Sequence, residues 1–172
     1  QREKTTPEKV NKPPQKPPFG LQYFPGKESV RLEFRPVWHP ASILSDHLTT
    51  SDGSPGLSAE YYDNMACRGK PITTRTDPQI AFQWKSSPAN KVPEDFFGVV
   101  WEGQLGPVPY GGNYRLTMKS NGRAQVWIDG DKLIDADGED TSHADIKLTQ
   151  DSMRKLKVQY AAGTGEARCD LQ

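Results

Sequence analysis

The sequence contains no hydrophobic run near the roughly 20 residues that a membrane-spanning helix requires, and residues 1–4 (QREK) begin no signal-peptide core. It has no net charge either, because 22 Lys and Arg residues balance 22 Asp and Glu residues. Without a field of one sign, binding to a phosphate backbone or an anionic membrane surface is not expected. We therefore expect no nucleic-acid partner and no membrane span in this chain, which is either cytosolic or processed from a longer precursor.

Cysteine is also scarce, and the two cysteines, Cys67 and Cys169, lie far apart in the sequence. An even number permits one disulfide. Such a bridge would close a loop of about a hundred residues and stabilise the fold by about 2–4 kcal/mol. Two buried thiols explain the same pair, so the residues alone leave both alternatives open.

The composition is polar but not that of a disordered chain. Mean hydropathy is -0.78 and 34% of residues are hydrophobic, yet 9% are aromatic and four are Trp, which favours a folded domain with a soluble tail. Residues 1–20 alternate Lys, Glu and Pro and predict an extended Pro-rich linker or arm. Residues 21–55 contain one strand pattern at 29–34 and at most one short helical turn, and they either pack on the main domain or belong to an upstream one. A Ser, Asp, Gly and Pro loop marks a boundary near Gly56.

Beyond residue 56, turn signals recur at short intervals between segments rich in β-branched and aromatic residues. This pattern predicts an all-β antiparallel sandwich, and no apolar stripe of helical period is long enough for a dominant helix. The clearest hairpin turns at Asp129 and Gly130, because this pair supplies the positive φ angles of a type I′ turn. The expected strands are 57–63, 79–84, 96–104, 113–119, 125–128, 132–134, 144–148, 154–160 and 167–171.

Six sequence blocks follow Gly56 in a recognisable order. They are GLSAEYYDN (56–64), RTDPQIAFQW (75–84), VWEGQL (100–105), GNYRLTMKS (112–120), VWIDG with LID (126–135), and KVQY with GEA and Leu171 (157–171). Together they resemble the protective-antigen (PA-fourteen) module of bacterial toxins, glycoside hydrolases and surface adhesins, over residues 56–172. The resemblance implies an antiparallel β-sandwich whose first and last strands lie together, which would bring Cys67 and Cys169 toward one another and favours the disulfide.

The resemblance also points to one loop as a ligand site. In sugar-binding members of the family, two consecutive Asp residues before the Trp strand hold a calcium ion, which in turn holds sugar hydroxyls; adjacent carboxylates suit calcium because it prefers six to eight oxygen ligands. In this sequence Asn121 and Gly122 occupy the positions of that pair, after Ser120. One amide oxygen does not replace two carboxylates, so the family's calcium pair is missing. Ser120 and Asn121 remain candidates for contacting a ligand.

A second acidic stretch, residues 135–140, lacks the ligand spacing of an EF-hand loop and reads as a solvated loop with a turn at Asp137 and Gly138. Calcium is the one cofactor that the residues suggest. If it binds, the ligands that we expect are Asp129, Asp135, Asp137 and Asp140.

Sugars are also bound without metal, by an aromatic ring against the C–H face of the sugar while polar groups bind the hydroxyls. Tyr110 and His143 supply suitable rings and Asp137 a carboxylate, although ordinary turn and rim positions explain them as well. Trp84, Trp101 and Trp127 fall inside strand patterns, so we expect them in the core.

No spacing indicates the paired carboxylates of a glycosidase, a metal-ligating His cluster or a phosphate-binding Gly-rich loop, so we expect no active site. Two functions of different class remain. The first is a carbohydrate-binding or adhesion module of a larger protein, located outside the cell, at its surface or in the periplasm, that binds a glycan or polysaccharide. The second is a scaffold or docking subunit of a surface assembly, in which residues 1–55 contact other protein subunits.

Overall fold

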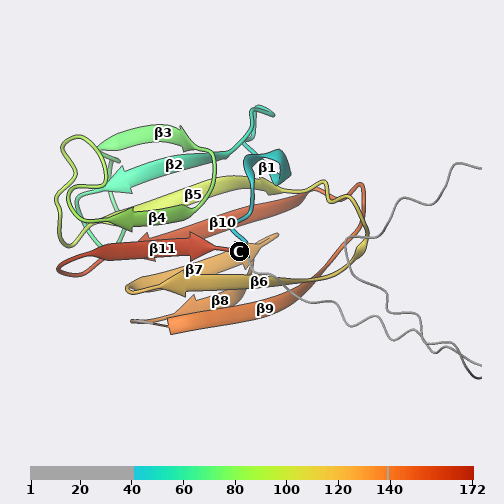
Figure 1. Ribbon diagram of the computed structural model, residues 1–172. Coiled ribbons are helices and arrows are strands. Elements are labelled where there is room, and N and C mark those ends of the chain that lie inside the picture. The colour runs from blue at the N-terminus through green and yellow to red at the C-terminus, as the bar shows by residue number, and fades with distance from the viewer. Residues whose placement is uncertain (1–40, 139) are drawn as a thin grey trace, which may run out of the picture. The chain divides into compact units, whose positions relative to one another are not determined.

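The computed structural model describes residues 41–138 and 140–172, which form two antiparallel β-sheets packed face to face (Figure 1). This confirms the predicted all-β sandwich. The chain divides into two units, residues 1–37 and 38–172, and everything described below belongs to the second. The predicted Pro-rich arm (1–20) and the strand pattern at 29–34 lie outside the described residues. Within the described ranges, no helix has the length and apolar character needed to span a membrane.

The two sheets are named by size. In the larger sheet the strand order is β3–β2–β5–β10–β7–β8, with β1 paired to β5. In the smaller sheet the order is β4–β11–β6–β9. The larger sheet contains β1 (Leu48–Thr49), β2 (Leu57–Tyr62), β3 (Thr73–Asp77), β5 (Gly98–Leu105), β7 (Arg123–Ile128), β8 (Asp131–Ala136) and β10 (Arg154–Ala161). The smaller sheet contains β4 (Ala81–Trp84), β6 (Gly112–Ser120), β9 (Asp140–Leu148) and β11 (Ala167–Leu171).

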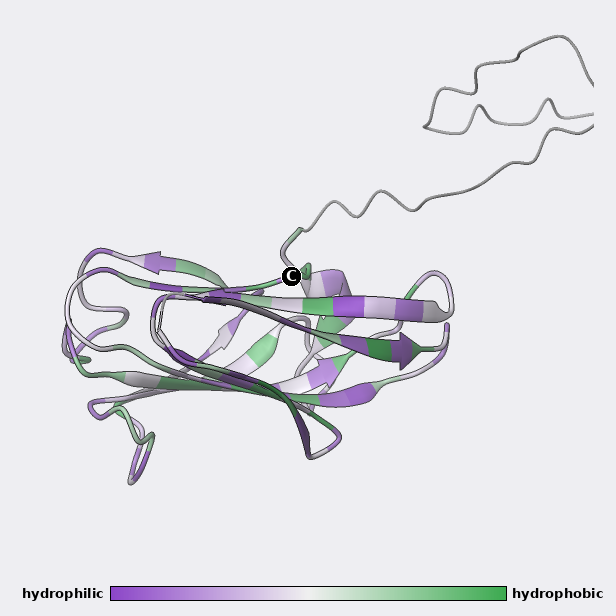
Figure 2. Cartoon of the chain, turned by 90° about the horizontal axis from the view of Figure 1, so that it is seen from below, coloured by the Kyte–Doolittle hydropathy of each residue, from purple (hydrophilic) through white to green (hydrophobic). Residues whose placement is uncertain are grey.

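The strands form because hydrophobic and polar residues alternate along them, which places one face on the core and the other in solvent. In β7, for example, Ala124, Val126 and Ile128 are buried, while the residues between them point outward. Figure 2 shows the same alternation along strands of both sheets. The hydrophobic core therefore lies between the sheets.

A buried carboxylate joins three strands of the larger sheet inside this core. Asp77, 3% exposed at the end of β3, accepts hydrogen bonds from Tyr61 Oη (2.6 Å) and Trp101 Nε1 (2.8 Å). Arg75 Nε bonds to its other oxygen at 2.6 Å, and the Arg75 guanidinium lies 4.5 Å from the centre of the Tyr61 ring. Burial beside Asp77 also raises the pKa of Tyr61 well above its usual value, so this phenol remains a donor. The charge is paired and its hydrogen bonds are made, as a buried carboxylate requires.

Each strand expected from the sequence has a counterpart, and the hairpin at Asp129 and Gly130 is present with positive φ angles of 53° and 94°. Strand β3 was not expected, because its residues TTRTD show no apolar alternation. It forms through pairing with β2 over Leu57–Tyr61 and through the carboxylate of Asp77.

The segment just before the expected boundary at Gly56 packs on the sandwich. It contains the short helical turn, a 3-10 helix η1 (Ser45–His47), followed by β1. Leu48 is buried and pairs with Leu105 of β5, while the Ile43 amide donates to Leu171 O at 3.1 Å. Residues 41–55 therefore contact both sheets.

The three strand tryptophans have different environments. Trp101 is fully buried, as expected. Trp84 is half-buried and stacks on Phe82, with ring centroids 4.8 Å apart. The expectation that Trp127 lies in the core is wrong: it is half-buried on the outer face, because the buried Val126 and Ile128 on either side of it occupy the inner face.

The expected disulfide is also corrected, since Cys67 and Cys169 are free thiols. Cys169 lies in β11 of the smaller sheet, with its sulfur 3.8 Å from Met118 Sδ. Cys67 follows β2 of the larger sheet, with its sulfur 4.0 Å from Tyr160 O. The strands next to these cysteines are in opposite layers, so they are not neighbours. Burial raises the pKa of Cys67 to about 11 and that of Cys169 well above its usual value, which keeps both thiols protonated at neutral pH.

Candidate functional site

The loop at which the family resemblance places a ligand is a tight turn between β6 and β7. Ser120 is fully buried, and its hydroxyl donates to Gly122 O at 3.1 Å. A Cβ on Gly122 would lie 2.3 Å from Ala161 O, so only glycine fits this close approach to β10. Ser120 and Gly122 thus shape the turn from inside the fold.

The Asn121 side chain is engaged within the protein. Its Oδ1 accepts hydrogen bonds from the Arg168 amide (2.7 Å) and from Tyr160 Oη (3.1 Å), and its Nδ2 donates to Glu166 O at 2.5 Å. These contacts tie the turn to β10, to β11 and to the loop between them. A ligand at the Asn121 amide oxygen would have to displace them.

The other expected ligand-contacting residues do not converge on this turn. Asp137 is exposed at the same end of the sandwich, in the connection from β8 to β9. Tyr110, 79% exposed, precedes β6, whereas Asn121 follows it, so the length of the strand, roughly 27 Å, separates them. His143 is exposed in β9, opposite Thr117 of β6. The structure therefore brings Ser120, Asn121 and Asp137 to one end and leaves Tyr110 and His143 elsewhere.

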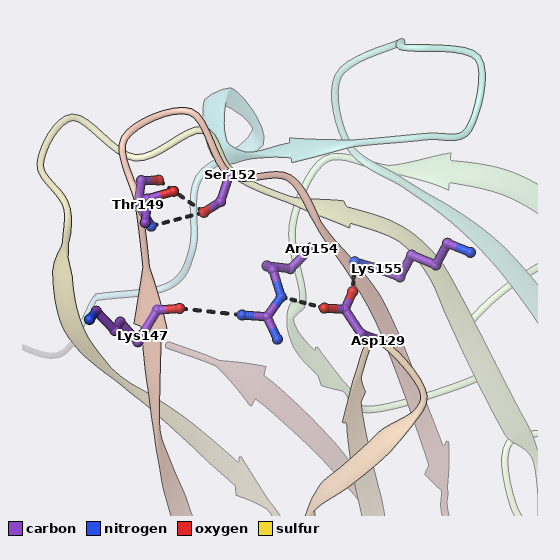
Figure 3. A network of polar contacts seen from close by, with 6 residues as sticks. All are labelled: Asp129, Lys147, Thr149, Ser152, Arg154 and Lys155. Atoms are coloured by element: carbon purple, nitrogen blue, oxygen red, sulfur yellow. Dashed lines mark hydrogen bonds and ion pairs between the residues drawn. The ribbon is translucent and has the colours of Figure 1, made fainter.

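The carboxylates expected to bind calcium do not form one cluster. Asp129 lies in the β7–β8 turn, where it bonds to Arg154 Nε and accepts the Lys155 amide at 2.7 Å (Figure 3). The same Arg154 reaches Lys147 O at 3.3 Å and so connects the turn to β9. The hydrogen bond from Arg154 lowers the pKa of Asp129.

The other carboxylates that were expected to bind calcium are also bonded to the protein itself or lie apart from Asp129. Asp135 bonds to Lys132 Nζ at 2.5 Å and to Gln125 Nε2 at 3.0 Å, and the Lys132 bond lowers its pKa. Asp140 accepts the Thr141 amide (2.6 Å) and the Ser142 hydroxyl (3.0 Å). Among the described residues, no three His, Cys, Asp or Glu side chains are arranged to hold a metal ion. The described structure therefore does not bring Asp129, Asp135, Asp137 and Asp140 together as one set of ligands.

The outer face of the larger sheet carries a groove of about 740 Å³, which we call the sheet-face groove. Trp127 lines it, together with polar side chains from β2, β5 and β10: Ser58, Glu102, Gln104, Lys155, Lys157 and Gln159. Lys157 Nζ and Glu102 Oε1 form an ion pair at 2.8 Å across neighbouring strands. The groove thus combines one aromatic ring with several hydrogen-bonding groups.

None of these groove residues was a predicted site residue. The sequence nevertheless contains a signal for the outward position of Trp127. Strict alternation in AQVWI (124–128) places this Trp on the face opposite to Ala, Val and Ile. The polar partners could not be found this way, since they come from strands distant in sequence.

The described residues thus form a two-layer antiparallel β-sandwich with a groove on one outer sheet face. The comparison with known families is more specific. The PA14 domain family matches residues 53–167, which is most of the described sandwich, and the chain belongs to this family.

Three similar proteins illustrate what this chain resembles. The anti-sigma-I factor RsgI3 of Acetivibrio thermocellus is 32% identical over 129 residues, covering 69% of this chain and 20% of that protein. An anti-sigma factor domain-containing protein from Clostridium clariflavum is 28% identical, with a TM-score of 0.62 over 67% of this chain and 40% of that one. The chain thus spans about one fifth and two fifths of their lengths. A PA14 sugar-binding domain from an RTX adhesin, 15% identical, covers 67% of this chain and 87% of that one with a TM-score of 0.55, which shows the shared fold.

Proposed function

We propose that this domain is a non-catalytic carbohydrate-binding module that works outside the cytoplasm as one part of a longer protein. The observation that carries the proposal is membership in the PA14 family across residues 53–167, because PA14 domains are carbohydrate-binding and adhesion modules. A binding role also suits the carboxylates. Asp77, Asp129 and Asp135 are all engaged with cationic or amide groups of the protein itself, which leaves them poorly placed as a catalytic acid and base.

The shares of the relatives that the chain covers support the proposal that this domain is one part of a longer protein. The chain matches only 20% of an anti-sigma-I factor and 40% of an anti-sigma factor domain-containing protein. We infer that this chain supplies the glycan-binding part of a longer protein, and that the rest of the parent protein supplies the response or the attachment. The alternative is docking to other protein subunits through residues 1–55, of which residues 1–40 lie outside the described residues and residues 41–55 contact the sandwich itself.

We further propose that glycan binding needs no calcium. At the position of the family's Asp pair, the Asn121 side chain is already hydrogen-bonded to Arg168, Tyr160 and Glu166 of the protein itself. Its neighbour Gly122 offers no side-chain ligand.

Affinity electrophoresis tests the proposed function. The full chain would be run through native gels that contain soluble xylan, mixed-linkage β-glucan, arabinogalactan or polygalacturonate, each with calcium chloride or with EDTA. We expect retardation on at least one polysaccharide under both conditions, with no release of reducing sugar. Equal mobility in all gels and in a polysaccharide-free gel would contradict carbohydrate binding.

A further inference from the structure

We propose that the sheet-face groove, and not the loop turn at Asn121, is where the module binds glycan, and that it takes an extended polysaccharide chain without a metal ion. This inference rests on the proposed carbohydrate-binding function and assigns its site. In it, the ring of Trp127 stacks on the C–H face of a sugar residue.

Trp127 has the placement that a stacking platform needs. Its backbone belongs to β7 between the buried Val126 and Ile128, so the indole is fixed to the outer face by the core packing of its neighbours. The pairing with β8 shifts in register between Val126 and Trp127, and the extra residue, Leu133, lies on β8, so β7 keeps the alternation that turns Trp127 outward. The indole is half-buried in the groove, which restricts its rotamers before a ligand arrives.

Polar side chains continue from the indole across the sheet. Residues opposite one another on neighbouring strands are Trp127 with Lys157, Lys157 with Glu102, and Glu102 with Ser58. The three strand spacings of this row span about 14 Å. That length exceeds one sugar ring, so an extended chain fits the row better than a monosaccharide.

The chemistry of the groove matches sugar hydroxyls, which both donate and accept hydrogen bonds. The amides of Gln104 and Gln159 do both as well. Lys157 and Glu102 neutralise each other at 2.8 Å, whereas Lys155 has no carboxylate within 4.0 Å among the described residues and remains a donor for a ligand oxygen. Such a groove needs no cation to bridge it to a glycan.

The loop turn at Asn121 differs from the groove because its polar groups are already bonded or buried. The Asn121 amide oxygen already accepts two hydrogen bonds, and Ser120 is fully buried. A sugar at the turn would have to compete with these internal partners, whereas one in the groove would displace only solvent.

The test compares Trp127→Ala and Gln104→Ala with a matched control, Phe96→Ala, in the same polysaccharide gels and buffers. Phe96 is an exposed ring, 55% accessible, outside the groove residues. We expect Trp127→Ala to weaken retention about tenfold or more, which corresponds to the loss of one aromatic–sugar contact. Gln104→Ala should weaken it less, and Phe96→Ala should leave it unchanged. Circular dichroism and the melting transition check that each variant is folded.

The outcomes separate the site from the function. Retention of the wild type together with undiminished retention of both groove variants would overturn the sheet-face site and leave carbohydrate binding standing. Retention of the wild type that disappears in EDTA would overturn metal-free binding. Failure of the wild type to bind any of the polysaccharides would contradict the proposed function itself.

Discussion

Trp101 and Trp127 lie in the same sheet, separated by β10, and have opposite environments. Trp101 is fully buried, donates to the Asp77 carboxylate at 2.8 Å and packs edge-on against Tyr61. Trp127 points away from the core into a groove lined by polar side chains. The same side chain therefore serves stability on the inner face, and on the outer face it is available for a ligand.

The difference shows how a β-sandwich separates two tasks by strand alternation alone. Inner residues are fixed by packing and by satisfied hydrogen bonds, so changes there are costly. Outer residues are positioned by the same backbone but contribute little to stability. We therefore expect changes to the inner face to lower the free energy of unfolding most. Changes to the loop turn should lower it less, and changes to the outer face least.

The largest effect is expected from Trp101→Ala. It removes the largest buried side chain of the core and leaves the Asp77 oxygen with one donor fewer, so we expect a loss of about 3–5 kcal/mol in the free energy of unfolding. Trp127→Ala is the matched comparison and should cost about 1 kcal/mol or less, because its indole already meets solvent. Urea unfolding measured by circular dichroism gives both values. Similar losses of unfolding free energy in the two variants would contradict the difference between the inner and the outer face.

An intermediate effect is expected from Asn121→Ala. It removes the three side-chain hydrogen bonds that tie the turn to residues 160–168, and we expect a loss of about 1–2 kcal/mol, because the freed groups can partly hydrate. Asn121→Asp serves as the control, since it keeps the acceptor to the Arg168 amide and loses the donor to Glu166 O. If Asn121→Ala abolished polysaccharide retention while the domain stayed folded, the ligand would be at the turn and not on the sheet face.

The smallest effect is expected from Asp129→Asn, on the surface. The bond from Arg154 lowers the pKa of Asp129, so ionised Asp129 stabilises the fold above the unfolded pKa of about 3.9, and this stabilisation is lost as the pH falls through the lower, folded value. We expect the wild type to exceed the variant by at most about 1 kcal/mol at pH 7, because the pair is solvent-exposed. The difference should vanish near pH 2. Urea unfolding at both pH values tests this, and a difference that grows toward low pH would reverse the assigned sign.

Strand alternation and turn chemistry were sufficient to predict most of the sandwich. The hairpin at Asp129 and Gly130 and the nine expected strands follow from local patterns. Strand β3 could not be predicted, because the polar sequence TTRTD becomes a strand only through its pairing with β2. The disulfide prediction failed because it relied on the first and last strands of the resembling family lying together, whereas β2 and β11 belong to different layers here.

The candidate site was less predictable than the fold. Trp127 was assigned to the core on its residue type, although its position between Val126 and Ile128 predicted the outer face. The role of Asn121 depends on partners 39 to 47 positions away, and the groove assembles side chains from several strands. Such information resides in strand pairing and not in any single segment.

The way in which the described domain begins and ends has a mechanical consequence. Ile43 is bonded to Leu171, β1 is paired with β5, and Gln172 exchanges two backbone hydrogen bonds of 2.8 Å with Thr117. The start and the end of the described domain thus lie next to each other and are hydrogen-bonded to both sheets. A pulling force applied at residue 41 and at Gln172 would therefore load these few backbone hydrogen bonds before the pairing inside the sheets, so the outer face would keep its shape.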